Sequence, residues 1–204
     1  MTATLRPVQP GDLDALYDIC IRTSNAGRDD SASYADRRLV GDIYAAPYAV
    51  LVPEWSFVAE DDEGVAGYAV GAPDTLGFAA VLEARWWPAL RQRHADPGPP
   101  PHASADAARA WQIHHPELPP AEVMAAYPGH MHMNLLPRAR GMGIGRALFT
   151  LWHDRARQQG LAGFHVGVSP LNPGGAAFWQ ACGMVRIATA RAAAHPAYWF
   201  GMIL

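Results

Sequence analysis

The most informative segment of the sequence lies between residues 135 and 146 and reads Leu135-Leu136-Pro137-Arg138-Ala139-Arg140-Gly141-Met142-Gly143-Ile144-Gly145-Arg146. An apolar run ends at Pro137, three glycines follow at alternate positions, and an amphipathic run then begins. This pattern predicts a strand, a glycine turn and a helix. Glycines allow positive φ and close approach to a ligand, and a helix N-terminus offers free N–H groups. The segment therefore predicts an anion site suited to a pyrophosphate, with Arg140 and Arg146 adding charged hydrogen bonds.

Other glycine motifs fit this segment less well. A dinucleotide-binding fingerprint needs G-x-G-x-x-G after the first strand, whereas here G-x-G-x-G stands in the last third of the chain. A P-loop needs Gly-Lys-Ser/Thr at its end, which is missing. A tight strand–helix turn that binds nothing is the remaining alternative.

Around this segment the hydrophobic pattern predicts a mixed α/β fold. The expected strands span residues 2–7, 55–60, 65–71, 130–136, 164–168, 184–190 and 197–204, and the expected helices span 12–23, 37–45, 75–93, 143–159 and 173–182. The Pro-rich stretch 94–120 is expected to be irregular, with one short helix possible over 119–126. The helix at 143–159 would cross between two parallel strands, 130–136 and 164–168. We expect one domain over 1–204, with an insertion at about 94–122.

The composition narrows the function classes. With 19 acidic residues against 16 basic ones, the chain has no basic excess for non-specific nucleic-acid binding. Two cysteines, Cys20 and Cys182, are too few for a disulfide framework and are expected in the core. No run approaches 18 apolar residues, and residues 1–10 lack the pattern of a signal peptide. We expect a cytoplasmic protein that works without a membrane or nucleic acid.

Two motifs of the sequence resemble the GNAT N-acetyltransferases. The run Pro137-x-x-Arg140-Gly141-x-Gly143-Ile144-Gly145 is similar to the acyl-CoA loop of that family, Q/R-x-x-G-x-G/A. Residues 172–184, NPGGAAFWQACGM, resemble its second element, N-x-x-A-x-x-x-Y-x-x-x-G-F. The two motifs are separated by the length of one helix and one strand. In element order the resemblance covers roughly residues 2–204.

A narrower resemblance comes from four further runs: YDICIRT at 17–23, NAGRD at 25–29, GDIYAAPY at 41–48 and HMNLLP at 132–137. They look like the bacterial stand-alone relatives of the C-terminal acetyltransferase-like domain of O-GlcNAcase. In that family the activity of the domain is doubtful, and the animal version looks like a pseudo-enzyme. Because this chain retains the glycine loop, the resemblance implies that it binds acetyl-CoA.

The resemblance also implies an acyl-CoA N-acyltransferase fold, in which a central parallel strand pair splays apart and helices cover both faces of the sheet. The pantetheine arm would enter between those strands, where backbone groups near Leu135 and Leu136 would pair with it. The implied cofactor contacts of the first motif are Arg138, Arg140, Gly141, Met142, Gly143, Ile144, Gly145 and Arg146. Those of the second motif are Asn172, Phe178 and Trp179.

Acetyl transfer to an amine needs a base, and it benefits from an acid for the departing thiolate. His130, His132 and Asn134 alternate and so share one strand face. His132 and Asn134 are the candidate catalytic residues, with His132 as the base because histidine has a suitable pKa. The alternative is that these residues are only the polar, half-solvated face of the strand. The family's usual tyrosine acid is replaced here by Trp179. No carboxylate or cysteine stands at a diagnostic spacing from the histidines, so no metal site is predicted.

The acceptor is expected near a charged loop between the first two helices, where Arg28, Asp29 and Asp30 could hold it; a solvated turn is the alternative. Two functions follow. The first is N-acetylation of a small-molecule or peptide amine by direct attack on acetyl-CoA. The second is a catalytically weak acyl-CoA-binding pseudo-acetyltransferase that recognises peptides or senses the cofactor. Either would act as a monomer or a homodimer.

Overall fold

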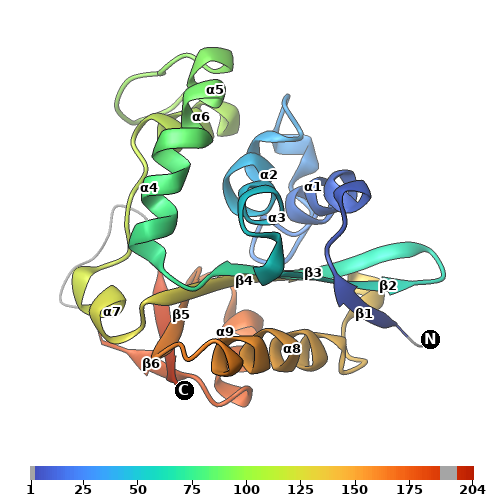
Figure 1. Ribbon diagram of the computed structural model, residues 1–204. Coiled ribbons are helices and arrows are strands. Elements are labelled where there is room, and N and C mark those ends of the chain that lie inside the picture. Colours follow the sequence, from blue (N-terminus) through green and yellow to red (C-terminus); the bar gives the residue numbers. More distant parts are fainter. Residues whose placement is uncertain (1–2, 189–196) are drawn as a thin grey trace.

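A computed structural model describes residues 3–188 and 197–204 and contains a seven-stranded mixed sheet (Figure 1). The strands run in the order β1-β2-β3-β4-β5-β7-β6, and every neighbouring pair is antiparallel except β4 and β5. Their bounds are Thr4–Pro7 (β1), Ser56–Asp61 (β2), Gly64–Ala72 (β3), Gly129–Leu135 (β4), Gly163–Val168 (β5), Val185–Ile187 (β6) and Tyr198–Ile203 (β7). The predicted mixed α/β class is confirmed.

Helices cover both faces of this sheet (Figure 1). On one face lie α1, α2 and α3, while α8 and α9 lie on the other; α4, α5 and α6 form an arm that rises beside α2. The bounds are Leu13–Ile21 (α1), Leu39–Tyr44 (α2), Ala46–Leu51 (α3), Thr75–Arg85 (α4), Trp87–Arg93 (α5), Ala105–His114 (α6), Ala121–Ala126 (α7), Ile144–Gln158 (α8) and Pro173–Ala181 (α9).

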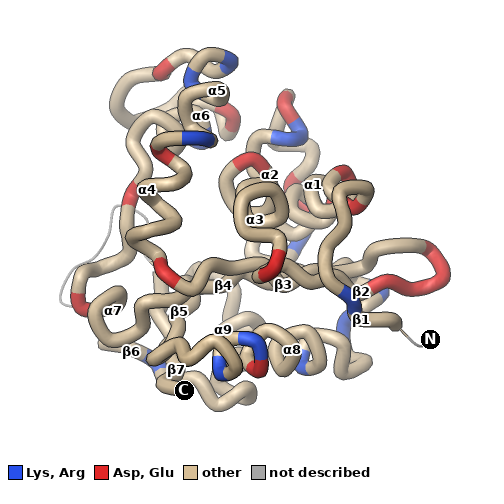
Figure 2. Tube along the Cα trace, in the orientation of Figure 1, with Lys and Arg blue, Asp and Glu red and all other residues tan. Residues whose placement is uncertain are grey.

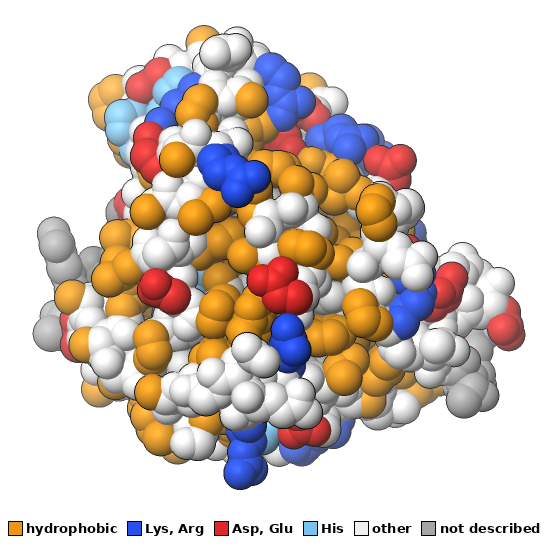
Figure 3. Space-filling view, in the orientation of Figure 1, with side chains coloured by type: hydrophobic (Ala, Val, Ile, Leu, Met, Phe, Trp, Pro, Cys, Tyr) orange, Lys and Arg blue, Asp and Glu red, His pale blue; other side chains and the backbone are white. Residues whose placement is uncertain are grey.

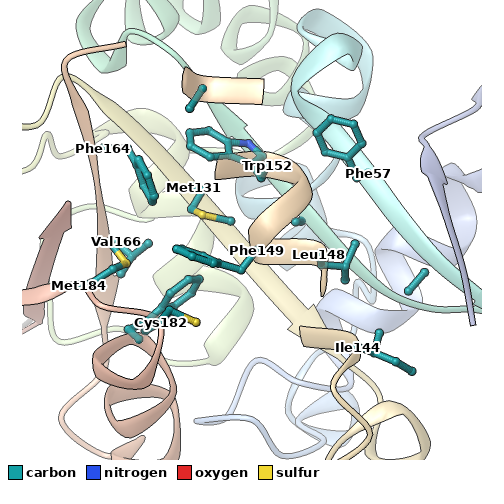
Figure 4. Close-up of a cluster of buried hydrophobic side chains, with 14 of the residues drawn as sticks. Phe57, Met131, Ile144, Leu148, Phe149, Trp152, Phe164, Val166, Cys182 and Met184 are labelled. Atoms are coloured by element: carbon teal, nitrogen blue, oxygen red, sulfur yellow. The ribbon is translucent and has the colours of Figure 1, made fainter. Parts of the chain in front are cut away.

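Each face of the sheet has its own hydrophobic core, because side chains alternate along the strands. Under α8, Trp152 and Leu148 are fully buried against Met131 and Phe164 (Figure 4). The Trp152 indole also donates a hydrogen bond to the carbonyl of Trp55, at 3.2 Å. The amphipathic pattern of the predicted helix at 143–159 thus marked the correct inward face. The opposite core lies under α1–α3.

The central parallel pair is splayed. β4 and β5 are in register only at Gly129–Phe164 and His130–His165. On its other edge β4 stays paired with β3 as far as Leu135. From Met131 onward, the backbone groups of β4 that face β5 therefore have no strand partner there. This is the splay that the sequence resemblance implied.

One predicted helix, 75–93, is wrong in a specific way: the structure divides it into α4 and α5 at Trp86. Pro88 stands in the first turn of α5. A proline there has no N–H to donate and its ring would clash with a carbonyl four residues earlier, so a continuous helix is excluded. The Trp86 indole donates to the carbonyl of Asp42 at 2.8 Å, which anchors the break to α2.

The Pro-rich stretch 94–120 was predicted to be irregular, and this is wrong for its middle. It contains the ten-residue helix α6, whose N-terminus is capped by the Ser104 hydroxyl accepting from the Ala107 amide at 3.1 Å. The serine cap was a usable sequence signal. The predicted helix at 37–45 is present as α2, and Pro47 stands in the first turn of a further short helix, α3. The predicted short helix over 119–126 is confirmed as α7.

The remaining expected elements are present with small shifts of their ends. The first strand begins at Thr4, and Thr2 lies outside the described residues. The predicted strand 184–190 is shorter, as β6, and its last two residues lie outside the described part. Among the described helices, none combines the length and the hydropathy that crossing a membrane requires.

Candidate functional site

The glycine loop lies where β4 ends and α8 begins, beside the splay. Gly141 and Gly143 have φ of +75° and +78°, and Gly143 is the N-cap of α8. A Cβ added to either would meet no atom within 4 Å. The N–H groups of the first turn of α8 have no acceptor inside the helix. The loop therefore presents backbone donors, at the positive end of a 15-residue helix, to open space.

The third glycine of the motif serves packing. A Cβ on Gly145 would lie 3.2 Å from the ring of Phe178 in α9. Gly145 thus allows α8 to approach α9 closely. Of the other predicted contacts in this loop, Met142 is 45% exposed, whereas Ile144 and Leu136 are buried.

The three arginines near the loop all have protein partners. Arg138 pairs with Asp61 at 2.9 Å, in the β2–β3 hairpin whose acidic turn stands out in Figure 2. Arg140 donates to two carbonyls, of Leu135 at 2.9 Å and of Gly27 at 2.7 Å. Arg146 donates to the carbonyl of Ala181. These bonds hold the loop in place. Nη1 of Arg140 and both Nε and Nη1 of Arg146 make no hydrogen bond within the described residues, so a contact of either arginine with an anion stays a prediction.

The second motif is built into α9. The Asn172 side chain caps this helix by accepting from the Gly175 amide at 2.9 Å. Trp179 is buried, with its ring 6.1 Å from that of Phe149 in the core under α8. These contacts are structural, and a contact of Asn172, Phe178 or Trp179 with a cofactor stays a prediction.

The candidate catalytic histidine lies in a chain of hydrogen bonds above β4. The Thr75 hydroxyl is 2.7 Å from the carbonyl of Pro128 and 2.9 Å from Nδ1 of His130. The Tyr48 hydroxyl lies between the two histidines, 2.8 Å from Nε2 of His130 and 3.1 Å from Nε2 of His132. The order is thus Pro128, Thr75, His130, Tyr48, His132.

The direction of this chain is fixed at one end, because a carbonyl only accepts. Thr75 must donate its one hydrogen to Pro128, so it accepts from Nδ1–H of His130. A neutral imidazole then has a lone pair on Nε2, which accepts from Tyr48. The Tyr48 oxygen in turn accepts from Nε2–H of His132. By this assignment, His132 carries its proton on Nε2 and keeps a lone pair on Nδ1.

The environment favours the neutral form of these histidines. Burial, together with the neighbouring His165, lowers the pKa of His132 to about 4. Burial likewise lowers the pKa of His130 well below its usual value, with contributions from His132 and His165. Both imidazoles are therefore neutral at neutral pH, as the directional chain requires. On the same strand face, Asn134 donates to the Tyr68 hydroxyl at 2.6 Å.

The charged loop at residues 28–30 lies against the glycine loop, through the bond from Arg140 to Gly27. Asp29 accepts from the Ser31 amide at 2.8 Å, and Asp30 from the Ser33 hydroxyl at 2.6 Å. Arg28 is exposed. Within residues 3–188 and 197–204, no hydrogen bond or ion pair joins this loop to His132. An acceptor-binding role for Arg28, Asp29 and Asp30 stays a prediction.

Sequence reasoning missed Tyr48 and Thr75, which complete the chain around His132. They come from α3 and the start of α4, far from β4 in sequence. No local motif marks either residue, because only the packing of α3 and α4 over β4 brings them together. Tyr48 does lie at the end of the run 41–48 that carried the narrower resemblance.

Over the described part of the chain, no three His, Cys, Asp or Glu side chains gather as a metal site would require. On the face drawn in Figure 3, the arginines lie at several separate places and form no continuous basic area.

Known proteins resemble this chain in sequence and in structure. The crystal structure of SsHAT is 36% identical and has a TM-score of 0.90, covering 100% of this chain and 98% of that one. The mouse Protein O-GlcNAcase is 23% identical over 171 residues, which is 82% of this chain. The match spans only 18% of the mouse protein, so this chain corresponds to about a fifth of its length.

More distant structures share the fold alone. One is yncA of Salmonella typhimurium, described as an acetyltransferase and solved with its cofactor acetyl-CoA. It is 13% identical, with a TM-score of 0.54, and the match covers 100% of this chain and 94% of that one. No family model matches the chain.

Proposed function

Because this chain belongs to the GNAT family of N-acetyltransferases, we propose that it transfers an acetyl group from acetyl-CoA to an amine by direct attack. The observation that carries the proposal is the position of the glycine loop directly beside the splay of β4 and β5. A pyrophosphate on the loop would leave the attached arm pointing along the unpaired edge of β4. The acetyl-CoA complex of yncA, which has the same fold, supports this assignment.

The anion-binding part of the proposal rests on the backbone. The N–H groups around Gly141 and Gly143 would hold the pyrophosphate, and Arg140 and Arg146, whose protein bonds go to uncharged carbonyls, would add charged hydrogen bonds, whereas Arg138 is paired with Asp61. Arg140 would also fix the loop between β4 and the turn at Gly27. Leu135 and Leu136 would present their backbone to the pantetheine arm.

Bound acetyl-CoA supplies a thioester whose carbonyl carbon forms a bond to the amine nitrogen, while its bond to sulfur breaks and coenzyme A leaves as a thiolate. We propose that His132 accepts the proton that the amine loses, on Nδ1. The hydrogen-bond chain keeps that nitrogen free of hydrogen, and Tyr48 continues to accept from Nε2–H after the transfer. Asn134, held by Tyr68, would orient groups on the same face.

Protonation of the leaving thiolate by the second motif is not part of this proposal. Trp179 replaces the tyrosine of the family, and its indole is buried beside the rings of Phe149 and Phe178. An indole N–H is also too weak an acid near neutral pH. The thiolate therefore leaves unprotonated or takes its proton from water.

Calorimetric titration with acetyl-CoA, desulfo-CoA and NAD tests the cofactor assignment. We expect acetyl-CoA and desulfo-CoA to bind with dissociation constants of about micromolar and NAD not to bind. Mass spectrometry after incubation with acetyl-CoA alone should find no acetylated protein, because direct attack needs no covalent intermediate. Binding of NAD but not of acetyl-CoA would overturn the cofactor assignment, and an acetyl-enzyme competent for transfer would overturn direct attack.

A further inference from the structure

A partly buried cation, Arg109, lies on the same side of the sheet as His132. Arg109 of α6 donates from Nε to the Tyr34 hydroxyl at 3.1 Å. Its Nη1 donates to Gln112 at 2.8 Å and to the Tyr44 hydroxyl at 3.3 Å. Its surroundings are thus neutral hydroxyl and amide groups. Removing a guanidinium from water is costly unless an anion compensates.

No such anion is supplied by the described residues. Within residues 3–188 and 197–204, no Asp or Glu oxygen lies within 4.0 Å of Arg109. Arg6, by contrast, is a partly buried arginine whose charge is balanced by a carboxylate, that of Asp12 at 2.7 Å. The positive charge is therefore available to an external anion.

Two donor groups beside this charge have no acceptor. Nη2 of Arg109 makes no hydrogen bond within the described part of the chain. In the described part of the chain, the side-chain atoms that are both shielded from solvent and without a hydrogen bond belong to Ser56, His94 and Arg155. Nη2 of Arg109 is not among them, so it is accessible to solvent. The Tyr34 oxygen accepts from Arg109, while its own hydrogen has no acceptor among those residues. Neighbouring donors without acceptors match a group that only accepts, such as a carboxylate.

A single side chain, Tyr44, lies between Arg109 and the candidate base His132. The Tyr44 ring meets the His132 ring edge-on, with centroids 5.9 Å apart, while its hydroxyl accepts from Arg109. A bound anion at Arg109 would thus be a short molecular length from His132. An acceptor with an amine at one end and an anion at the other could reach both groups.

The position of these donors is fixed in advance. Asp106, in the first turn of α6, accepts from the backbone amides of Ala35 at 3.0 Å and Asp36 at 2.8 Å. These bonds join the helix that carries Arg109 to the loop that carries Tyr34. Helix α6 also packs against α2 and α5 in the arm (Figure 1). The two donors, Arg109 from α6 and Tyr34 from the loop before α2, are thus preorganised.

We propose that Arg109 and Tyr34 form a subsite for a carboxylate of the acceptor, so that the acceptor is an amine that also carries a carboxylate. This inference rests on the proposed acetyl transfer. A carboxylate fits better than a phosphate, because the subsite offers one cation and three free hydrogens, two on Nη2 and one on Tyr34. A phosphate dianion would need further positive charge.

The test uses matched amines with the full chain. Glycine, β-alanine and γ-aminobutyrate are compared with their carboxamides and with O-phosphoethanolamine. Binding is measured by calorimetry in the presence of saturating desulfo-CoA, which cannot react, and kcat/KM is measured with acetyl-CoA. At least one amino acid should be preferred over its amide by about tenfold or more, which corresponds to one charged hydrogen bond.

The variants separate this subsite from a structural role of Arg109. Arg109→Gln should remove the preference for the carboxylate, Arg109→Lys should keep part of it, and Tyr34→Phe should weaken it with the ring in place. Arg85→Gln, an exposed arginine on the same arm, is the matched control and should keep the full preference. Melting temperatures show whether each variant is folded.

Each outcome of these measurements supports or refutes the carboxylate subsite or the proposed function. If acetyl-CoA binds but the wild-type protein does not distinguish acids from amides, or binds none of these amines, the subsite is refuted while the cofactor assignment stands. A preference that survives in folded Arg109→Gln refutes it as well. A preference for O-phosphoethanolamine over all the amino acids would refute the carboxylate and assign a phosphate. Failure to bind acetyl-CoA would instead refute the proposed function.

Discussion

At the scale of single residues, Gly141 and Gly143 contribute something different from Gly145. The first two supply a positive φ and leave open space, whereas the third allows α8 and α9 to touch. From the sequence all three were expected to serve the anion. The motif located the loop correctly, but the space around each α-carbon depends on α9, which local sequence does not reveal.

Gly143→Glu should abolish acetyl-CoA binding. The new carboxylate would stand where backbone N–H groups meet the pyrophosphate, and the residue would be strained at φ of +78°. Gly98→Glu is a matched control, since Gly98 has the same φ of +78° and equally open surroundings in the insertion. Titration of both folded variants is the measurement; normal acetyl-CoA affinity of Gly143→Glu would contradict the role of the loop.

His132→Gln should lower kcat by about a hundredfold, the usual contribution of a general base. It should leave the acetyl-CoA dissociation constant nearly unchanged, because the side chain faces away from the core under α8. His115→Gln, at an exposed histidine, is the control and should keep full activity. Steady-state kinetics with a saturating amine is the measurement, and an unaffected kcat would rule out His132 as the base.

Tyr48→Phe should allow His132 to adopt both neutral tautomers. In the wild-type protein the Tyr48 oxygen holds the proton on Nε2; without it the imidazole can carry the proton on either nitrogen. Nitrogen-15 NMR of the histidine side chains distinguishes the two forms directly. We expect one Nε2–H form in the wild-type protein and a mixture in the variant. A wild-type spectrum of the Nδ1–H form would contradict the assigned direction of the chain.

At the scale of elements, the sequence predicted the presence of helices and strands better than their ends. The strong period of 143–159 gave α8 almost complete, but the helix predicted over 75–93 ignored Pro88, and the Pro-rich region hid α6. The high proline content of 94–120 predicts an irregular chain, but the prolines flank α6 and none lies inside it. A local cap at Ser104 was the better indicator.

Asp106→Asn should loosen α6 from the loop before α2. Each carboxylate oxygen accepts one backbone hydrogen bond, and asparagine replaces one of these oxygens with an NH2 group, which cannot accept from a backbone N–H. We expect a loss of about 1 kcal/mol in unfolding free energy, seen as a melting temperature lower by about 2–4 °C. Asp154→Asn, at an exposed carboxylate paired only with neighbouring His153, should melt like the wild-type protein. Equal melting of the two variants would show that the Asp106 contacts add nothing.

At the scale of the whole molecule, the site draws on segments that lie far apart in sequence. Tyr34, Tyr48, Thr75, Arg109 and His132 come from the loop before α2, from α3, from α4, from α6 and from β4. The resemblance predicted the role of the glycine loop and pointed to the strand with His132, since both are local motifs. The partners of His132 and the position of Arg109 could not be predicted, because their proximity arises only when the arm and α1–α3 pack over the sheet.

The three histidines with lowered pKa values, His130, His132 and His165, should make the free energy of unfolding depend on pH. Their pKa values are lowered in the folded state, that of His132 to about 4, against about 6.5 when unfolded. Between these values the unfolded chain binds more protons, so the unfolding free energy should fall as pH falls from about 6.5 toward 4, by up to about 1.4 kcal/mol per pH unit for each histidine. Urea unfolding over this range is the measurement. His132→Gln should reduce the slope, and an unchanged slope would contradict the burial of its neutral form.

The two strands that form the splay, β4 and β5, are separated by the order in which the chain is synthesised. Strands β1–β4 are built from residues up to Leu135 and pair in sequence order, so all four are synthesised before the glycine loop and α8. Strands β5–β7 follow α8 and come last. Strand β5, the second wall of the splay, follows α8 in sequence, so a nascent chain that stops before β5 would carry His132 and the glycine loop but only one wall of the splay.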